Sequence, residues 1–379
     1  MKKDVLVIFG GVSPEHEVSI ITGLQVIEAI DRSKYSVHGL YITQSGDFQL
    51  LPQMKSRKDF RTSRRSTITF GHDKHGGFIS HNHIFSQKIH LYCACVALHG
   101  GNGEGGAIQG LLDSIGTPYT SPGYESSVLL MNKALTKQCV SQAGIPTISG
   151  MSFTSVEIEE EFESCIDKIE VELHLPVIIK PAHLGSSIGI SIAHTRIELE
   201  KFLKASTFVD TEIIVEKFLS SIIEFNCAVR LINDQLETSE IEKPVSHDEF
   251  LTFAEKYERG GKKTQQGGGM ATLERELPAK IEPHLRDKIK TYAQNAFRAC
   301  RCTGMVRIDF IYADGELYLS EINAIPGSMS FYLWEATGIQ FKDQVSDLIE
   351  SSVELSRKKS LLRLEYDSKI VDTFLEINQ

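Results

Sequence analysis

The stretch MVRIDFIYADGELYLSEINAIPGS, from Met305 to Ser328, decides how the second half of this chain folds. Apolar and polar residues alternate through MVRIDFIY and again through LYLSEINA, which is the period of a strand with one buried face. The Asp314-Gly315 pair between them is a turn signal that reverses the chain. The stretch therefore predicts two antiparallel strands, the floor of an α+β unit, followed by a Pro-Gly turn and an apolar run that contains the only tryptophan, Trp334.

Two hairpin geometries would place different residues opposite each other. A two-residue loop at Asp314-Gly315 places Asp309 opposite Ser320 and leaves Glu321 on the other face. A three-residue loop over residues 313–315, with its last glycine in the left-handed conformation, instead places Asp309 and Glu321 on one face. We expect the three-residue loop, because the chemistry described next needs both carboxylates on the same face.

The shared face would carry carboxylate and amide oxygens close together. Asp309, Glu321 and Asn323 supply these oxygens, and Arg307 shares the face of Asp309. Like charges in a half-buried site need a cation, and hard oxygen ligands suit Mg²⁺ that is shared with substrate phosphates. The alternative is a solvated outer face without a metal. The strand pair alone leaves both interpretations open.

Length and composition limit the classes of protein that this chain can be. A chain of 379 residues is too long for one simple core and predicts two or three packed units. The formal net charge of −10 argues against nonspecific binding to nucleic acid or anionic lipid. Seven cysteines without a C-x-x-C pair indicate reduced thiols of a cytosolic protein. No apolar run approaches the length of a membrane span, so we expect no membrane partner.

The N-terminal third alternates strand and helix in the way that is typical of a parallel α/β sheet. VLVIFGG is a buried strand that ends in a Gly pair, a helical period follows, and YSVHGLYIT is a second strand. HLYCACVALHGGNGEGGAIQGLLDSIG repeats strand, Gly-rich turn and helix. Residues 50–90 are poorer in pattern: the run KSRKDFRTSRR indicates a solvated loop, and the histidines after it lack the spacing of a metal site.

Lysines beside buried segments favour the metal and phosphate interpretation. Lys180 ends the apolar strand PVII and precedes a Gly-Ser-Ser loop whose amides and hydroxyls can cradle an anion. Lys133 lies in a helical segment, and Lys256 begins a Gly-rich loop of the kind that forms lids. There is neither a P-loop motif nor a G-x-G-x-x-G after the first strand, so a nucleotide would need a different scaffold.

Residues near the middle of the chain suit an adenosine site. Glu216 and Glu224 flank KFLSSII and can accept hydrogen bonds from an adenine amino group and a ribose hydroxyl. Phe218 and Leu219 can sandwich the base. The alternative is a pair of exposed turn acids.

Several motifs, taken in order, resemble the D-alanine–D-alanine ligases of the ATP-grasp superfamily. They are GGVSPEHEVS, HGGNGEGGAIQGLLD, MNKALTK, VIIKPAHLGSSIGIS, VEKFL, FAEKY, VRIDF and EINAIPGS. The resemblance spans about Val5 to Ile349. Agreement of many motifs in order is far more specific than one Gly-rich stretch.

The resemblance implies an ATP-grasp fold that combines α/β and α+β units. A parallel N-terminal domain would span residues 1–120, a central lobe residues 121–213 and a C-terminal lobe residues 214–379, with a lid loop over 246–275. ATP would lie between the central and C-terminal lobes with two Mg²⁺ ions, for which Mn²⁺ could substitute. The implied activity is the joining of two D-alanines through an acyl phosphate for peptidoglycan synthesis, by a cytoplasmic homodimer.

The resemblance also implies a role for each matched residue. Those implied for the nucleotide are Lys133, Lys180, Ser187, Glu216, Phe218, Leu219, Glu224 and Lys256, and those implied for metal are Asp309, Glu321 and Asn323. Glu15 would hold the ammonium of the first amino acid, with Ser186 and Tyr257 in its hydrogen-bond network. The oxyanion would be stabilised by Arg307 and the amide of Gly327, and His99 would lie near the substrates.

Three departures from the family pattern leave the product open. Gly105 stands where an acidic residue is usual, and the loop after Tyr257 is longer and richer in glycine than expected. A tyrosine stands where a small hydroxyl would receive the carboxylate of the second amino acid, so the candidates for that pocket are Ser328, Ser330, Tyr332 and Leu333. Alternatives are the same ligation with another amino acid or a hydroxy acid as second substrate, and a non-catalytic nucleotide-binding regulator.

Overall fold

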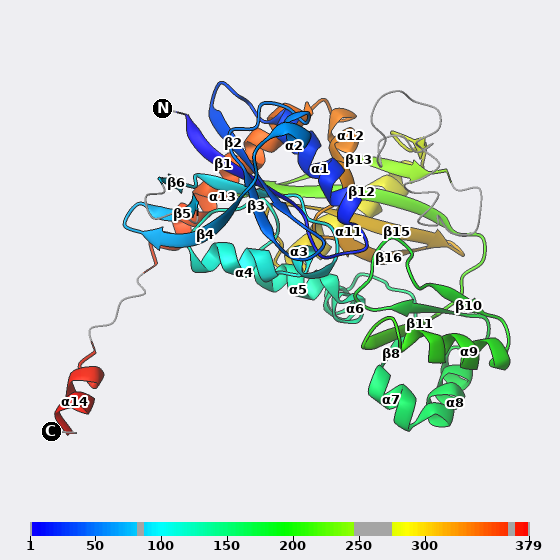
Figure 1. Cartoon of the computed structure of the whole chain (residues 1–379). Helices are drawn as coiled ribbons and strands as arrows, with labels where there is room; N and C mark the ends of the chain where they lie inside the picture. The colour runs from blue at the N-terminus through cyan, green and yellow to red at the C-terminus, as the bar shows by residue number, and fades with distance from the viewer. Residues whose placement is uncertain (1, 82–86, 246–274, 363–367, 378–379) are drawn as a thin grey trace.

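Three β-sheets carry the fold (Figure 1). The computed structural model describes residues 2–81, 87–245, 275–362 and 368–377. Seven strands form the N-terminal sheet, four the central sheet and five the C-terminal sheet. Across those four described ranges, no helix has both the length and the apolar character that crossing a membrane requires.

The N-terminal sheet is parallel at its centre, as the sequence predicts. Strand β1 pairs in parallel with β2 on one side and with β7 on the other, and α1 packs on β1 as the crossover to β2. Because β1 and β7 run in the same direction, the Gly-rich turns that follow them meet at one edge of the sheet. The elements are β1 (Lys3–Gly10), α1 (His16–Ala29), β2 (Tyr35–Ile42), β7 (Cys93–Val96), α3 (Gly101–Glu104) and α4 (Ala107–Ser114).

The segment expected to be poor in pattern contains regular structure instead. Four antiparallel strands extend the sheet beyond β2 in the order β3, β4, β5, β6, so regular structure is present where the sequence pattern is poorer. In β4, Ile68 and Phe70 alternate with exposed Thr67 and Thr69, but the apolar side chains are only half-buried and the alternation covers only four residues, so the strand signal is weak. The run over residues 55–65 is mostly exposed, as predicted. The elements are β3 (Phe48–Leu51), α2 (Asp59–Thr62), β4 (Ser66–Asp73), β5 (Gly76–His81) and β6 (Lys88–His90).

The central part forms an antiparallel sheet in the order β10, β9, β11, β8. Helices α7, α8 and α9 lie together on one side of it (Figure 1) and enclose a separate hydrophobic cluster. Capping boxes at Thr154 and Thr195 fix the starts of α7 and α9, each worth about 1 kcal/mol. The elements are α5 (Tyr124–Met131), α6 (Lys133–Gln142), β8 (Gly150–Thr154), α7 (Ser155–Glu160), α8 (Phe162–Glu172), β9 (Val177–Pro181), β10 (Ser191–Ala193), α9 (Arg196–Ser206) and β11 (Glu212–Lys217).

The C-terminal sheet is antiparallel in the order β14, β13, β12, β15, β16, which confirms the predicted antiparallel floor. Its helix α11 packs on β12 and β13. The elements are β12 (Ile223–Ile232), β13 (Gln235–Pro244), β14 (Arg275–Glu276), α11 (Pro283–Ala299), β15 (Met305–Ala313), β16 (Glu316–Asn323), the 3₁₀ turn η3 (Gly327–Ser330), α12 (Phe331–Glu335), α13 (Phe341–Ser360) and α14 (Ile370–Ile377).

The turn of the β15–β16 hairpin differs from the expected one. Ala313 pairs with Glu316, so the loop consists of the two residues Asp314 and Gly315, which have φ values of 52° and 80°. Two left-handed residues in a two-residue loop match the twist of the flanking strands. The expected three-residue loop is therefore wrong.

A bulge inside β16 nevertheless produces the facing pair that was expected. The pairing register of β15 and β16 shifts between Asp309 and Phe310. Phe310 pairs with Leu319 and Asp309 with Glu321, so Ser320 has no opposite residue on β15. Asp309 then faces Glu321, and Arg307 faces Asn323. The extra residue thus lies beside the polar face and not in the turn.

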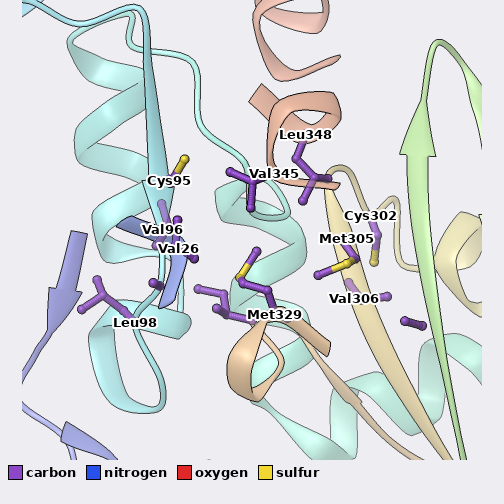
Figure 2. Packing of buried hydrophobic residues seen from close by; sticks show 14 of the residues in the cluster. Val26, Cys95, Val96, Leu98, Cys302, Met305, Val306, Met329, Val345 and Leu348 are labelled. Carbon is purple, nitrogen blue, oxygen red and sulfur yellow. The ribbon is translucent and has the colours of Figure 1, made fainter. Parts of the chain in front are cut away.

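One continuous hydrophobic cluster joins the N-terminal and C-terminal sheets. Figure 2 shows Leu98 on one side and Met305 on the other, with Met329 between them. The central sheet has its own cluster. The first and last parts of the chain therefore share a core, and the central part packs as a separate lobe. All seven cysteines are free thiols.

Candidate active site

A cavity is lined by residues from all three parts of the chain. The N-terminal part contributes the loops after β1 and β7, the central part the start of α6 and the loop after β9, and the C-terminal part the end of β16. The predicted site residues that line this cavity are Glu15, His99, Lys133, Ser186, Arg307, Glu321, Asn323 and Gly327.

The polar face of β15 and β16 forms one wall of the cavity. The Arg307 guanidinium donates two hydrogen bonds of 2.7 Å to the Asp309 carboxylate, and the Asn323 amide donates a third of 3.0 Å. Burial acts to lower the pKa of Arg307, but the adjacent Asp309 carboxylate raises this pKa well above its usual value. Arg307 is therefore a fixed, oriented cation.

The oxygen donors of this wall fit a magnesium ion. Asp309 and Glu321 face each other across the two strands, and Asn323 lies two residues beyond Glu321. Within the described residues, no group of three or more His, Cys, Asp or Glu side chains is arranged to hold a metal alone. Two carboxylates and an amide leave coordination positions for phosphate oxygens, which is how proteins commonly bind Mg²⁺ with a nucleotide.

Glu15 lies at the N-terminal side of the cavity, immediately before α1. The Ser186 hydroxyl donates a short hydrogen bond to Glu15 Oε1 and so connects the central lobe to the N-terminal domain. Ser186 has a φ of 53°, a left-handed conformation that a non-glycine residue keeps only where its surroundings hold it. Glycine is needed nearby, since a Cβ on Gly100 would lie 2.7 Å from Glu15 Oε2.

His99 is buried beside the same wall. Its Nε2 lies 2.8 Å from Thr22 Oγ1, which also accepts a 3.0 Å hydrogen bond from the backbone amide of Ser328. Burial lowers the pKa of His99 to about 4, so the imidazole is neutral at pH 7. The neutral ring links the loop after β7 to η3.

Glu104 is a half-buried acid that lines the cavity and that the sequence did not assign to the site. Its carboxylate accepts hydrogen bonds from the backbone amides of Gly100 at 2.9 Å and Ile325 at 3.1 Å. Burial, and then repulsion from Glu15, raises the pKa of Glu104 to about 7. Two acids that repel each other at this end of the cavity favour a cationic ligand there.

The raised pKa of Glu104 makes a contribution to the stability of the ligand-free protein that is larger in mild acid, in opposition to the contribution of His99, whose pKa is lowered. Between the usual glutamate pKa of 4.5 and about 7, Glu104 binds one proton more in the folded state than in the unfolded state. Its contribution to the free energy of unfolding therefore falls as the pH rises through this window, by at most roughly 3 kcal/mol. Urea unfolding at pH 5 and pH 7.5 measures this. Glu104→Gln should lack this part of the pH dependence, and a variant with the full wild-type dependence would contradict the assignment.

The central lobe contributes lysines to the site. Lys133 at the start of α6 donates a short hydrogen bond to the Leu184 carbonyl, and its Nζ lies 3.9 Å from Glu321. Lys180 Nζ lies 2.5 Å from Glu216 Oε2 on the neighbouring strand. Because the Glu216 side chain is only 1% exposed, it is not the exposed turn acid of the alternative interpretation.

The predicted adenosine residues lie around the turn between β11 and β12. Leu219 packs against a small buried cluster that includes Ile148 and Ile311, while the Phe218 ring lies 6.1 Å from that of His194. Burial lowers the pKa of Lys180 to about 8, although the nearby negative charges of Glu321 and Glu224 act to raise this pKa.

Residues 327–330 form a left-handed turn after Pro326. Ser328, Met329 and Ser330 have φ values of 52°, 53° and 46°, and all three are buried. Gly327 lines the cavity, but Ser328 and Ser330 do not. Three left-handed residues other than glycine cost free energy, so the packing around them holds this turn in place.

Tyr332 and Leu333 lie in α12 behind this turn and outside the lining of the cavity. The Tyr332 hydroxyl donates a 3.2 Å hydrogen bond to Glu242, and the Arg275 guanidinium lies 4.1 Å from the centre of the Tyr332 ring. Leu333 is fully buried in the shared core. Their predicted contact with the second substrate stays a prediction.

Two predicted site residues, Lys256 and Tyr257, lie outside the described residues, as does the expected lid loop apart from its last residue. Two further residues of the site were not predicted from the sequence: Glu104, and Lys137, which pairs with Glu216. A signal for Lys137 is present: it follows Lys133 by four residues in a helix, which places both on the same face.

The central and C-terminal lobes are each built on an antiparallel sheet. The central lobe carries lysines, and the C-terminal lobe carries oxygen ligands of the kind that bind magnesium. This combination defines an ATP-grasp enzyme. Two family models match the chain: "D-ala D-ala ligase N-terminus" over residues 4–122 and "D-ala D-ala ligase C-terminus" over residues 139–350. The chain belongs to the D-alanine–D-alanine ligase family, which confirms the resemblance seen in the sequence and makes it an ATP-dependent ligase.

Relatives and solved structures agree with this placement. The D-alanine–D-alanine ligase of Thermosipho melanesiensis is 35% identical over 95% of this chain and 96% of its own length. That of Chloroherpeton thalassium is 33% identical over 96% of this chain and 100% of its own. The solved VanG D-Ala:D-Ser ligase of Enterococcus faecalis has a TM-score of 0.78 and 28% identity, covering 93% of this chain and all of that one. At 24% identity, the solved ligase of Coxiella burnetii shares the fold, with a TM-score of 0.77, over 95% of this chain and 96% of that one.

Proposed function

We propose that this enzyme joins two D-alanines, using ATP, to make a dipeptide for peptidoglycan synthesis. A carboxylate is a poor electrophile, so an oxygen of the first amino acid takes the γ-phosphoryl group of ATP and releases ADP. The amine of the second amino acid then attacks the acyl phosphate, and phosphate leaves. The observation that carries the proposal is the convergence of Glu15, Arg307, Glu321 and Asn323 on one cavity. Asp309 lies directly behind this wall, where it faces Glu321 and holds Arg307.

The ATP site is proposed between the central and C-terminal lobes. Lys133, Lys180 and Ser187 would contact phosphates, with Glu216, Glu224 and the apolar pair 218–219 around the adenosine. Asp309, Glu321 and Asn323 would hold two Mg²⁺ ions, or Mn²⁺, which neutralise phosphate charge when bound. The burial of Lys180 and Glu216 supports this, since two buried charged groups need defined partners.

The amino-acid site is proposed at the other end of the cavity. Glu15, held by Ser186, binds the ammonium of the first D-alanine, and the raised pKa of Glu104 means that a bound ammonium would also favour its ionised form. Arg307 and the backbone amide of Gly327 stabilise the tetrahedral oxyanion of the second step. Both groups line the cavity, and Arg307 is held rigid by Asp309.

A second candidate is the same ligation with another second substrate. Two observations favour it. Position 332 has a tyrosine, whose hydroxyl is hydrogen-bonded to Glu242, where a residue with a small hydroxyl is expected. A similar solved structure is that of a D-Ala:D-Ser ligase. Purified protein should release ADP and phosphate only with D-alanine and Mg²⁺ present. Mass spectrometry of products from D-alanine with a panel of D-amino acids and D-hydroxy acids separates the candidates, and no stimulation by D-alanine would defeat the substrate assignment.

We also propose the boundaries 1–120, 121–213 and 214–379 for the three domains, a lid over 246–275 that includes Lys256 and Tyr257, a homodimer and a cytoplasmic location. Water destroys an acyl phosphate, so a lid that closes over the site suits the chemistry. Light scattering of the purified chain tests the dimer.

Glu15→Gln is expected to raise the KM for the first D-alanine about tenfold or more, because a buried ammonium loses its opposite charge. The KM for ATP should change much less. Steady-state kinetics with each substrate varied provide the measurement. Glu17→Gln, an exposed acid two residues further on in α1, is the matched control. A change confined to ATP would contradict the role of Glu15.

A further inference from the structure

Lys137 belongs to a buried charge cluster, and the proposed reaction assigns no role to this residue. It forms an ion pair with Glu216 Oε1, while Lys180 occupies Oε2. The Glu216 side chain is 1% exposed, and those of Lys137 and Lys180 are 12% and 13% exposed. One carboxylate therefore holds two ammonium groups in a nearly dry environment.

The local fold brings these three side chains together. Lys180 on β9 pairs with Ile214 on β11, so Glu216, two residues further along, lies diagonally across from Lys180 on the same face. Helix α6 packs on this face through Ala134, which forms a buried cluster with Ile214. One turn further along α6, Lys137 reaches Glu216. The position of Lys137 is thus set by the helix and not by a flexible loop.

The charges around Lys137 place it beside the nucleotide site. Burial, and then repulsion by Lys180 and Lys133, lowers the pKa of Lys137 well below its usual value, and Glu321 acts in the opposite direction. Lys137, Lys133 and Lys180 thus lie close enough to repel one another, with Glu216, Glu321 and Glu224 around them. Three ammonium groups gathered in one region suit contact with a polyanionic ligand. An ammonium kept here despite this environment needs Glu216 as its partner.

We propose that Lys137 is a positioning residue, which fixes the Glu216 carboxylate by ion pairing so that Glu216 receives the adenine amino group and Lys180 stays directed at the phosphates. The inference rests on the proposed ATP site. A carboxylate whose oxygens each hold an ammonium keeps lone pairs for one further donor and cannot rotate freely. The 6-amino group of adenine is such a donor, whereas the 6-oxo group of guanine would be repelled. Lys137 therefore sets both the affinity for the nucleotide and the choice of base.

The first test measures binding of MgADP and MgGDP by calorimetry, without turnover. Lys137→Met should raise the Kd for MgADP about tenfold or more and lower the preference for MgADP over MgGDP, because Glu216 is then held only by Lys180. Lys137→Arg keeps the charge and should stay within about threefold of wild type. Lys201→Met, an exposed lysine of the same lobe, is the control. Thermal unfolding of each variant separates loss of the site from loss of the fold.

The second test asks whether Lys137 acts through Glu216. Glu216→Gln alone should also raise the Kd for MgADP. Adding Lys137→Met to Glu216→Gln should raise this Kd by less than about a further twofold. Full additivity of the two changes, or wild-type affinity and base preference in a folded Lys137→Met, would overturn the inference. If wild-type protein binds neither nucleotide, the proposed ATP site itself fails, which is a distinct outcome.

Discussion

Glu321→Gln is expected to reduce the rate of ADP formation about 100-fold or more at saturating substrates, with little loss of stability. The amide keeps the shape of the carboxylate but removes one of the two charges that face each other on β15 and β16. A Mg²⁺ ion held by one carboxylate and two amides binds more weakly, so part of the lost rate should return at high Mg²⁺ or with Mn²⁺. The measurement is ADP release against metal concentration.

The same strand supplies the control for this experiment. Glu316 begins β16 and pairs at 2.7 Å with Lys288, far along the strand from the polar face. Glu316→Gln should therefore leave the metal dependence unchanged. Full activity of Glu321→Gln at low Mg²⁺ would show that the metal ligands have been assigned to the wrong residues.

The pairing of Asp309 with Glu321 could be predicted from the sequence, but the geometry that produces it could not. The period of two fixes which residues share a face, and the need for a cation selects the register. A bulge within β16 and an extra residue in the turn give the same facing pair. Which of them occurs depends on the tertiary surroundings of the hairpin, and the sequence of the two strands alone does not contain that information.

Residues that act through tertiary contacts were the hardest to foresee. Lys180 could be selected because an apolar strand precedes it. Lys137 lies in a polar helix, and its spacing from Lys133 indicates a shared face, but its burial against Glu216 is evident only in the fold. Glu104 lies in a Gly-rich turn, and its raised pKa arises from burial and from Glu15, nearly 90 residues away along the chain. Burial of a charge is a property of the fold and not of local pattern.

Arg307→Lys is expected to lower the rate of dipeptide formation about 100- to 1,000-fold. The guanidinium is held by two 2.7 Å hydrogen bonds to Asp309, so its remaining N–H groups have a fixed direction. Lysine keeps the charge but offers a mobile point donor, which loses the orientation that an oxyanion in the transition state requires. Stopped-flow or steady-state assays of dipeptide by mass spectrometry measure the effect, with Arg230→Lys on the adjacent strand β12 as a buried control outside the cavity.

The ratio of dipeptide to ADP shows which of the two steps Arg307 serves. If Arg307 stabilises the oxyanion of the second step, the acyl phosphate still forms in the variant but has a longer lifetime. A larger fraction of it is then hydrolysed by water. ADP release should then fall less than dipeptide formation, so that the ratio drops below one. If both rates fell equally and the ratio stayed at one, Arg307 would instead act before the acyl phosphate forms, by holding Asp309 for the transfer of the phosphoryl group.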